Sequence, residues 1–244
     1  MITKNEIKFI RSLKLKKNRI KFEQFIVEGE KLVDELIDSS MELVRLYSTS
    51  LKYEYLDSLY TKISKTNLSQ ISNLKTPNKV LAIFGIPKPK KTDFTSQIIA
   101  LDNISDPGNL GTIIRLCDWF GVKDLLCNTE TVDCYNPKVI QASMGSISRV
   151  NINYIDFKEL LSDKNLNTVV ADLDGHPMNE FEFETNQIVI FGNESIGISD
   201  EIKNMVKNRV TIPRYNSNLD VESINVANSV AIILAELKNK STGK

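Results

Sequence analysis

The chain has 244 residues, 41% of them hydrophobic and 25% charged, which is enough to bury a sizeable core in one large or two small domains. Its 31 basic and 31 acidic side chains cancel, so the total charge does not point to a nucleic-acid partner. No apolar run approaches the ~20 residues of a membrane span, and three cysteines without a C-x-x-C pair argue against a zinc or disulfide framework. We therefore expect a cytoplasmic protein with neither a membrane partner nor a metal site.

The distribution of charge is more informative than its sum. Residues 1–22 contain eight lysines or arginines but only one acidic residue, Glu6. A block of this kind is typical of a surface that binds phosphate groups, although a solvated basic face without a partner is the alternative. We expect Lys14, Lys16, Lys17 and Arg19 to contact the phosphates of a nucleic acid.

The first eighty residues predict a small module of alternating helices and strands. A basic amphipathic helix is expected at Lys4–Leu13. Further helices or helical turns are expected at Glu30–Ile37, Tyr53–Leu59 and Ser69–Leu74, and strands at Phe25–Val27, Leu43–Tyr47, Lys62–Ile63 and Val80–Phe84. The prolines and lysines of Pro87–Lys91 then indicate a linker, so a domain boundary is expected here.

Beyond the linker the alternation continues with longer elements, which favours a mainly parallel sheet covered on both faces. Strands are predicted at Ile98–Leu101, Asp124–Cys127, Arg149–Tyr154, Thr168–Ala171, Ile188–Phe191 and Arg209–Ile212. Helices are predicted at Asn109–Phe120, Pro137–Ser146, Phe157–Ser162, Ser199–Val206 and Ser223–Lys238.

The last predicted helix has no charged residue between Ile224 and Ala235. A surface helix normally shows a charged outer face, so this helix is expected to be buried on most sides. Burial by a second subunit and burial within one chain both remain open.

The centre of the chain is the stretch Ala100–Val122, which predicts a strand, a tight loop and a helix. Asp106-Pro107-Gly108 forms the turn signal, and Asn109 stands where a helix N-cap is expected. Such loops at the carboxyl ends of strands bind ligands in open α/β sheets, although most strand-loop-helix units hold no site. Arg115, in a helix that is otherwise apolar on its inner side, either extends to the surface or points at an anion.

Two later stretches have the same character. Phe191–Gly197 is a loop with two glycines and a carboxylate after an apolar strand, and Ile212-Pro213 leads by a loop to Ser223–Val226 at the last helix. Each follows the carboxyl end of a predicted strand, so the three loops can converge on one ligand.

With these three motifs in order, the chain resembles the SpoU/TrmH family of RNA 2'-O-ribose methyltransferases, within the SPOUT superfamily. The motifs read D-P-x-N-x-G-x-I-x-R at Asp106–Arg115, F-G-N-E-x-x-G at Phe191–Gly197, and I-P followed by S-[LI]-N-V at Ser223–Val226. Asn136–Lys138 and Ser143–Gly145 also match the stretch between the first two motifs. The amino-terminal part is similar to the small ribosomal-protein-like substrate-binding domain of many members.

The resemblance implies methyl transfer from S-adenosylmethionine to a ribose 2'-hydroxyl of structured RNA, ribosomal RNA rather than transfer RNA. It implies an RNA substrate-binding domain at residues 1–86, a linker at 87–95 and a knotted α/β methyltransferase domain at 96–244. It also implies a homodimer.

The resemblance further assigns site residues. Arg115 would be catalytic, either as a base activated by an RNA phosphate or as a clamp on that phosphate. Asn109 would cap its helix and hold Arg115 or the ribose, Glu194 would orient Arg115 or Asn109, and Asn225 would be a polar contact near the reacting groups. Gly192, Ile212, Ile224 and Ser223 would hold the cofactor, with Ser223 also capping the last helix and Ile224 replacing a more usual leucine. The loop Arg214–Glu222 is longer than a minimal connection.

Three other functions stay open. The chain can be a transfer RNA 2'-O-methyltransferase, or a non-catalytic RNA-binding or ribosome-assembly protein of the same fold. The retained Arg115, Asn109, Glu194 and Asn225 weaken the non-catalytic hypothesis. A nucleotide-binding oxidoreductase is disfavoured, because neither G-x-G-x-x-G nor a P-loop occurs in the central stretch.

Overall fold

The computed structural model describes residues 2–216 and 223–242. The chain forms two compact units, the first made of residues 1–88 and 133–148 and the second of residues 89–132 and 149–244. The segment 133–148 thus clusters with the amino-terminal part of the chain, although it falls inside the stretch expected to form the methyltransferase domain. Among the described residues, no helix has the length and apolar character that crossing a bilayer requires.

The first unit is built on a four-stranded sheet in the order β1-β4-β2-β3, in which β4 is antiparallel to β1 and β2 while β2 and β3 are parallel. Its elements are α1 (Lys4–Ser12), α2 (Lys16–Phe22), β1 (Gln24–Glu28), α3 (Glu30–Ile37), β2 (Leu43–Ser48), the 3-10 helix η1 (Leu51–Leu59), β3 (Tyr60–Lys62), α4 (Lys65–Ile71), β4 (Val80–Gly85), α6 (Pro137–Ser143) and the 3-10 helix η2 (Ser146–Ser148).

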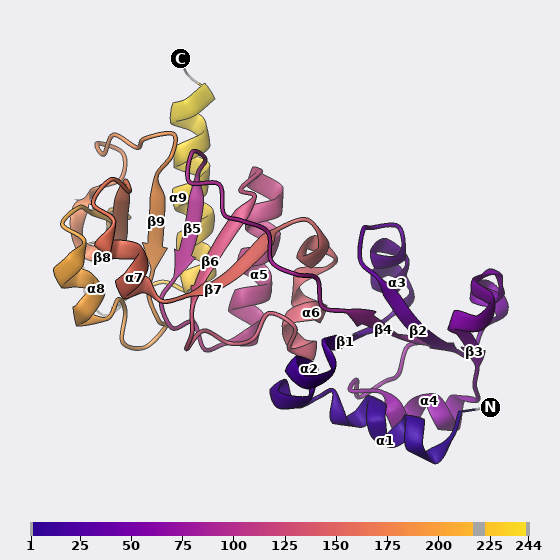
Figure 1. Ribbon diagram of the computed structural model, residues 1–244. Coiled ribbons are helices and arrows are strands. Elements are labelled where there is room, and N and C mark those ends of the chain that lie inside the picture. Colours follow the sequence, from indigo (N-terminus) through magenta and orange to yellow (C-terminus); the bar gives the residue numbers. More distant parts are fainter. Residues whose placement is uncertain (1, 217–222, 243–244) are drawn as a thin grey trace. The chain divides into compact units, whose positions relative to one another are not determined.

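Helices α1 and α4 cover one face of this sheet (Figure 1). Ile10 and Leu13 at the end of α1 pack with Leu68 and Ile71 of α4 against Tyr47 and other residues of the strands. The helical turn predicted at Ser69–Leu74 is wrong in its bounds. Ser64 caps α4, with its hydroxyl accepting from the Asn67 N–H at 3.1 Å, so the helix begins earlier than the apolar spacing suggested.

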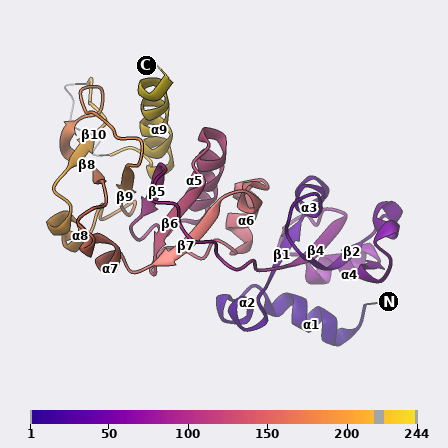
Figure 2. The same cartoon turned by 45° about the horizontal axis from the view of Figure 1, so that its top comes forward.

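The second unit contains a six-stranded sheet in the order β10-β8-β9-β5-β6-β7, and every paired strand is parallel. This confirms the predicted mainly parallel sheet. Its elements are β5 (Ile98–Leu101), α5 (Pro107–Phe120), β6 (Asp124–Asn128), β7 (Asn151–Ile155), α7 (Phe157–Ser162), β8 (Thr168–Pro177), β9 (Ile188–Phe191), α8 (Asp200–Met205), β10 (Arg209–Thr211) and α9 (Val226–Thr242). Figure 2 shows β10 beside β8 at one edge.

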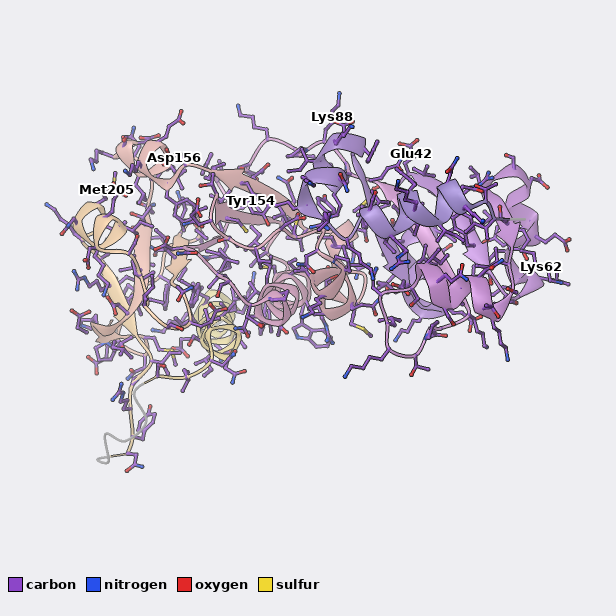
Figure 3. All side chains as sticks on the ribbon, turned by 90° about the horizontal axis from the view of Figure 1, so that it is seen from below. Glu42, Lys62, Lys88, Tyr154, Asp156 and Met205 are labelled. Atoms are coloured by element: carbon purple, nitrogen blue, oxygen red, sulfur yellow. The ribbon has the colours of Figure 1, made fainter. Side chains whose placement is uncertain are left out.

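The strands of the second unit are apolar on both faces because helices cover both. Ile98, Ala100 and Ile190 pack with α7 and α8 in one core. Successive side chains of a strand point to opposite faces, so Ile99 and Leu101 face the other layer, where α5 and α9 lie in Figure 1. Asp156, which is labelled in Figure 3, caps α7 by accepting a hydrogen bond from the Lys158 N–H at 2.8 Å.

The expected linker is tied to the second unit. The Lys90 N–H donates to the Asn151 side chain at 3.0 Å, and the Lys90 carbonyl accepts from the side chains of Asn151 and Asn153, both at 3.0 Å. Pro89 and the residues after it therefore run along β7 as part of this unit.

The uncharged stripe of the last helix is buried within the chain itself. Val230, Ile233 and Leu234 of α9 are inaccessible to solvent. Of the two explanations that the sequence left open, intrachain packing accounts for this stripe without a second subunit.

Candidate active site

A cleft of about 670 Å³ opens in the second unit beside the middle of β8, where β9 and β10 end and α9 begins. This volume lies in the range of small-molecule and cofactor sites. Six residues predicted for the site line it: Gly192, Glu194, Ile212, Ser223, Ile224 and Asn225. Apolar side chains such as Phe191, Ile198, Val210 and Ile233 line it as well, so the cleft offers both apolar walls and polar groups to a ligand.

The loop after β5 starts α5 earlier than predicted. Helix α5 begins at Pro107, and its N-cap is Asp106, whose carboxylate accepts from the Asn109 N–H at 2.8 Å. The prediction that Asn109 is the N-cap is therefore wrong, because the Asp106-Pro107 pair supplies both the cap and the first helical residue. This leaves the Asn109 side chain free for other contacts.

Three predicted site residues from three separate loops form a connected hydrogen-bonded chain. The Asn109 Nδ2 donates to Glu194 Oε1 at 2.9 Å, and Asn109 Oδ1 accepts from Asn225 Nδ2 at 2.9 Å. The carboxylate thus sets the orientation of the first amide, and the first amide sets that of the second. Of the two partners proposed for Glu194, the structure provides Asn109.

Glu194 also closes the loop that precedes α5. Its carboxylate accepts from the Ser105 N–H at 3.3 Å, the Ser105 hydroxyl at 3.2 Å and the Asp106 N–H at 3.2 Å. Partial burial raises the pKa of Glu194, but the hydrogen bonds from Asn109 and from backbone N–H groups outweigh it and hold this pKa below its ordinary value. Glu194 is therefore ionised at neutral pH and serves as an acceptor.

Gly192 is required by a close approach of two backbone segments. A Cβ atom at this position would lie 2.3 Å from the carbonyl carbon of Gly197 and 2.3 Å from the Ile198 nitrogen. Asn193 and Gly197 are paired by two backbone hydrogen bonds of 2.9 and 3.0 Å, which fold the loop back over Gly192. Any side chain here would push the cleft wall open.

The start of α9 differs from the prediction. The helix begins at Val226, and the Asn225 Oδ1 accepts from the Ala227 N–H at 2.9 Å. Asn225, and not Ser223, is therefore the residue that caps this helix, while Ser223 and Ile224 precede it in the cleft wall. Most of the loop Arg214–Glu222 lies outside the described residues.

Arg115 does not line the cleft of its own chain. Its side chain is exposed on α5, and among the described residues it makes neither a hydrogen bond nor an ion pair. Arg115 lies six positions after Asn109 on the helix, which turns the two side chains to different faces. Neither Asn109 nor Glu194 orients it.

The cleft also contains an ion pair that the sequence did not predict. Asp172 of β8 and Lys203 of α8 both line the cleft, and the Lys203 Nζ lies 2.7 Å from Asp172 Oδ2. The available signal was the position of Asp172, directly after the predicted strand Thr168–Ala171, although β8 continues to Pro177 in the structure.

In the first unit, the predicted RNA-binding residues separate into two groups. Lys14, Lys16 and Lys17 are exposed, as phosphate contacts need to be. Arg19 is buried: its Nε donates to Asp133 Oδ2 at 2.8 Å and its Nη1 to the carbonyls of Leu13 and Lys14 at 2.9 and 2.7 Å, while its Nη2 pairs with Asp133. The Arg19 guanidinium therefore stabilises the first unit through these hydrogen bonds and is not available to RNA.

Two family models match the chain. The model of the SpoU rRNA Methylase family covers residues 96–235, and the model of an MRM3-like substrate binding domain covers residues 4–82. Together they span the cleft-bearing strands and the basic amino-terminal module.

The chain is also similar to characterised and solved proteins. It is 27% identical to the 23S rRNA (guanosine(2553)-2'-O)-methyltransferase RlmP of Bacillus subtilis, over 96% of each chain. A TrmH-family putative RNA methyltransferase of Porphyromonas gingivalis is 32% identical with a TM-score of 0.89, over 98% of this chain and 99% of the other. An AdoMet-bound rRNA methyltransferase of Sinorhizobium meliloti shares the fold, with 24% identity and a TM-score of 0.86 over 98% and 96% of the two chains.

Proposed function

Since the chain belongs to the SpoU rRNA methylase family, we propose that it transfers a methyl group from S-adenosylmethionine to a ribose 2'-hydroxyl of ribosomal RNA. Family membership confirms the predicted reaction class, RNA 2'-O-methyl transfer. It also confirms the α/β methyltransferase fold, which follows a small α/β substrate-binding module in the sequence. The AdoMet bound to the Sinorhizobium protein supports the predicted cofactor. We choose ribosomal over transfer RNA because the Bacillus relative is named as a methyltransferase of 23S ribosomal RNA.

The single observation that carries this proposal is the hydrogen-bonded chain Glu194–Asn109–Asn225 beside the cleft. A ribose hydroxyl needs a fixed direction and a polar environment before it can attack a methyl carbon. The oriented side-chain amides of Asn109 and Asn225 provide hydrogen-bond donors and acceptors for the ribose. As weak nucleophiles, they do not accept the methyl group in its place. We assign Asn109 and Asn225 to binding the ribose and Glu194 to orienting Asn109.

The cleft fits the cofactor. When bound, S-adenosylmethionine supplies the methyl group from its sulfonium sulfur. We propose that Gly192, Ile212 and Ile224 hold it mainly through backbone groups and that Ser223 adds a polar contact. The close approach of backbone at Gly192 and the mixed polar and apolar walls support this assignment.

We propose that Arg115 binds the RNA phosphate next to the target ribose. Its exposure and its lack of a partner among the described residues leave the guanidinium available for bidentate phosphate binding. As a base it would have to give up a guanidinium proton, which arginine side chains in proteins do not release, so a clamp that stabilises the approaching RNA is the more economical role.

We propose that the enzyme is a homodimer and that its carboxyl-terminal domain is knotted, as in the family it resembles. Two large apolar side chains near the packed helices α5 and α9 support the dimer: Trp119 is 85% exposed and Ile232 is 36% exposed. Arg115 and Trp119 are four residues apart and share one face of α5, so this interface would also carry Arg115. Sedimentation showing only monomers at micromolar concentration would exclude the dimer.

We propose that residues 1–86 form the RNA substrate-binding domain, joined by residues 87–95 to the methyltransferase domain at 96–244. The exposed Lys14, Lys16 and Lys17 support the RNA-binding role. We propose a cytoplasmic location, in line with a sequence whose three cysteines include no C-x-x-C pair.

The test is transfer of labelled methyl from S-adenosylmethionine to unmodified ribosomal and transfer RNA, followed by nuclease digestion to locate the label on ribose or base. Ribose label on ribosomal RNA is the expected result. Label on transfer RNA alone would reassign the substrate. Cofactor binding without label on either RNA would favour the non-catalytic RNA-binding protein.

A further inference from the structure

Asp102 is a buried carboxylate at the centre of the second unit that none of the preceding assignments uses. It follows Leu101 at the carboxyl end of β5, only 2% of its surface is accessible, and it does not line the cleft. Its backbone N–H donates to the Phe191 carbonyl at 2.8 Å, which continues the ladder between β5 and β9. A buried charge needs a reason, because burial without compensation is costly.

Each carboxylate oxygen of Asp102 binds one neutral donor from a different segment. The Asn128 Nδ2, at the end of β6, donates to Oδ1 at 2.8 Å. The Ser199 N–H, directly before α8, donates to Oδ2 at 2.8 Å. Asp102 therefore connects the ends of two strands to the far end of the loop 192–199.

Asn128, which donates to Asp102, also binds the segments that follow β5 and β6. Its Oδ1 accepts from the Asn103 N–H at 2.9 Å, the Thr131 N–H at 3.0 Å and the Thr131 hydroxyl at 2.8 Å. Asn103 has a positive φ of 62°, a conformation that needs support from its surroundings. The Asn103 carbonyl in turn accepts from the Asn193 Nδ2 at 2.7 Å.

The loops joined in this way carry the residues proposed to act on the ribose. Residues 102–109 end at Asn109, and residues 192–199 contain Gly192 and Glu194. Glu194 reaches Asn109 only if the two loops keep their present separation, and the 2.9 Å hydrogen bond between them tolerates little displacement.

We infer that Asp102 is a positioning residue for methyl transfer, which fixes the loop 192–199 against β5 and β6 so that the cofactor wall and the Glu194–Asn109 pair are preorganised. The effect of Asp102 on methyl transfer rests on the proposed function. Its fixing of the loop 192–199, which forms part of the cleft wall, does not.

The chemistry of the cluster explains why position 102 needs a carboxylate. An asparagine there has one acceptor and one NH2 group, so it can accept from Ser199 or from Asn128 but not from both. In Asp102→Asn one of the two donors would face another donor, and one of the two connections would open.

The same chemistry supplies a rescue variant. In the double variant D102N/N128D, the carboxylate at 128 can still accept from Asn103 and Thr131 through one oxygen and accept from the new amide at 102 through the other. The amide oxygen at 102 remains to accept from Ser199. Both connections of the wild type are therefore kept, and the net charge is that of the wild type.

The experiment measures S-adenosylmethionine affinity by calorimetry and kcat and KM for RNA with the wild type, D102N and D102N/N128D. We expect D102N to weaken cofactor binding and to lower kcat/KM for RNA by about tenfold each, the effect of one misplaced buried hydrogen bond. The swap variant is expected to recover both to within about threefold of the wild type.

Asp124→Asn is the matched control. Asp124 is 5% exposed and accepts from the Asn151 Nδ2 at 2.6 Å, but it lies at the opposite, amino-terminal end of the same sheet. D124N should lower the thermal midpoint as D102N does, while cofactor affinity and kcat/KM stay at wild-type values.

Wild-type cofactor affinity and kcat/KM in D102N would overturn the inference, and so would a folded swap variant no better than D102N. If the wild type methylates no RNA while the loss and recovery of cofactor affinity are as described, the proposed function fails and the positioning of the cleft wall by Asp102 stands.

Discussion

The amino-terminal basic segment and helix α5 each carry an arginine predicted to meet RNA, and the structure uses the two arginines in opposite ways. Arg19 is buried, with Asp133 and two backbone carbonyls as its partners. Arg115 is exposed and has no partner among the described residues. A buried, fully bonded guanidinium stabilises the fold, whereas an exposed, unpaired one is available to a ligand.

The difference shows why residue type and local charge do not define a functional arginine. Arg19 lies in a denser basic cluster than Arg115, yet a carboxylate 114 residues away in sequence decides its role. The same segment keeps Lys14, Lys16 and Lys17 exposed, so structural and RNA-facing groups alternate within a few residues.

The largest effect is expected for Arg19→Ala. The substitution leaves the mostly buried Asp133 carboxylate and two carbonyls without their donor, which should lower the free energy of unfolding by about 3–5 kcal/mol. Denaturant unfolding followed by circular dichroism measures it. Arg11→Ala, an exposed arginine of the same segment, is the control and should change stability by no more than about 0.5 kcal/mol. Equal, small effects of the two variants would refute the structural role of Arg19.

Arg115→Ala should show the reverse pattern. Loss of a guanidinium that binds the substrate phosphate is expected to lower kcat by about 100-fold, while the exposed position keeps the unfolding free energy within about 0.5 kcal/mol of wild type. Methyl transfer to RNA and denaturant unfolding are measured on the same preparation. A variant that loses stability in proportion to its activity would remove the contrast with Arg19.

A smaller effect is expected for the triple variant Lys14→Gln, Lys16→Gln and Lys17→Gln. Removing up to three phosphate contacts should weaken RNA binding by about tenfold at moderate salt and flatten the dependence of log K on log salt by about 2 to 3. Filter binding across a salt series measures both quantities, with cofactor affinity as the unaffected reference. Unchanged binding and an unchanged slope would mean that this basic face has no RNA partner.

The smallest effect concerns Glu194 and pH. Because its folded-state pKa lies below the ordinary value, ionised Glu194 contributes stability above the unfolded pKa, and this contribution disappears as pH falls through the folded pKa. The stability difference between wild type and Glu194→Gln should therefore be largest near pH 7 and shrink below pH 4.5, by no more than about 1 kcal/mol after solvent screening. Thermal midpoints of both proteins between pH 3 and pH 7 test this, and a difference independent of pH would contradict it.

Much of the fold could be predicted from local patterns. Strands such as Ile98–Leu101 and Ile188–Phe191 have the predicted bounds because four consecutive apolar residues specify a strand buried on both faces. Helix starts were less accurate. Asp106 and Asn225 cap helices assigned to Asn109 and Ser223, because several polar residues near each start can serve as the cap and only backbone geometry selects one.

Three short, ordered motifs carried the resemblance that predicts the reaction class and the cofactor, and apolar periodicity predicted the mainly parallel sheet, because both signals are properties of short segments. Which groups meet depends on the folded chain: Glu194 pairs with Asn109, Asn109 with Asn225, Asp102 with Ser199, and Arg19 with Asp133. Each of these pairs joins residues at least 85 positions apart, and such contacts depend on the packing of the sheet and its loops. Local sequence carries no record of that packing, so it could suggest the members of the site but not their partners.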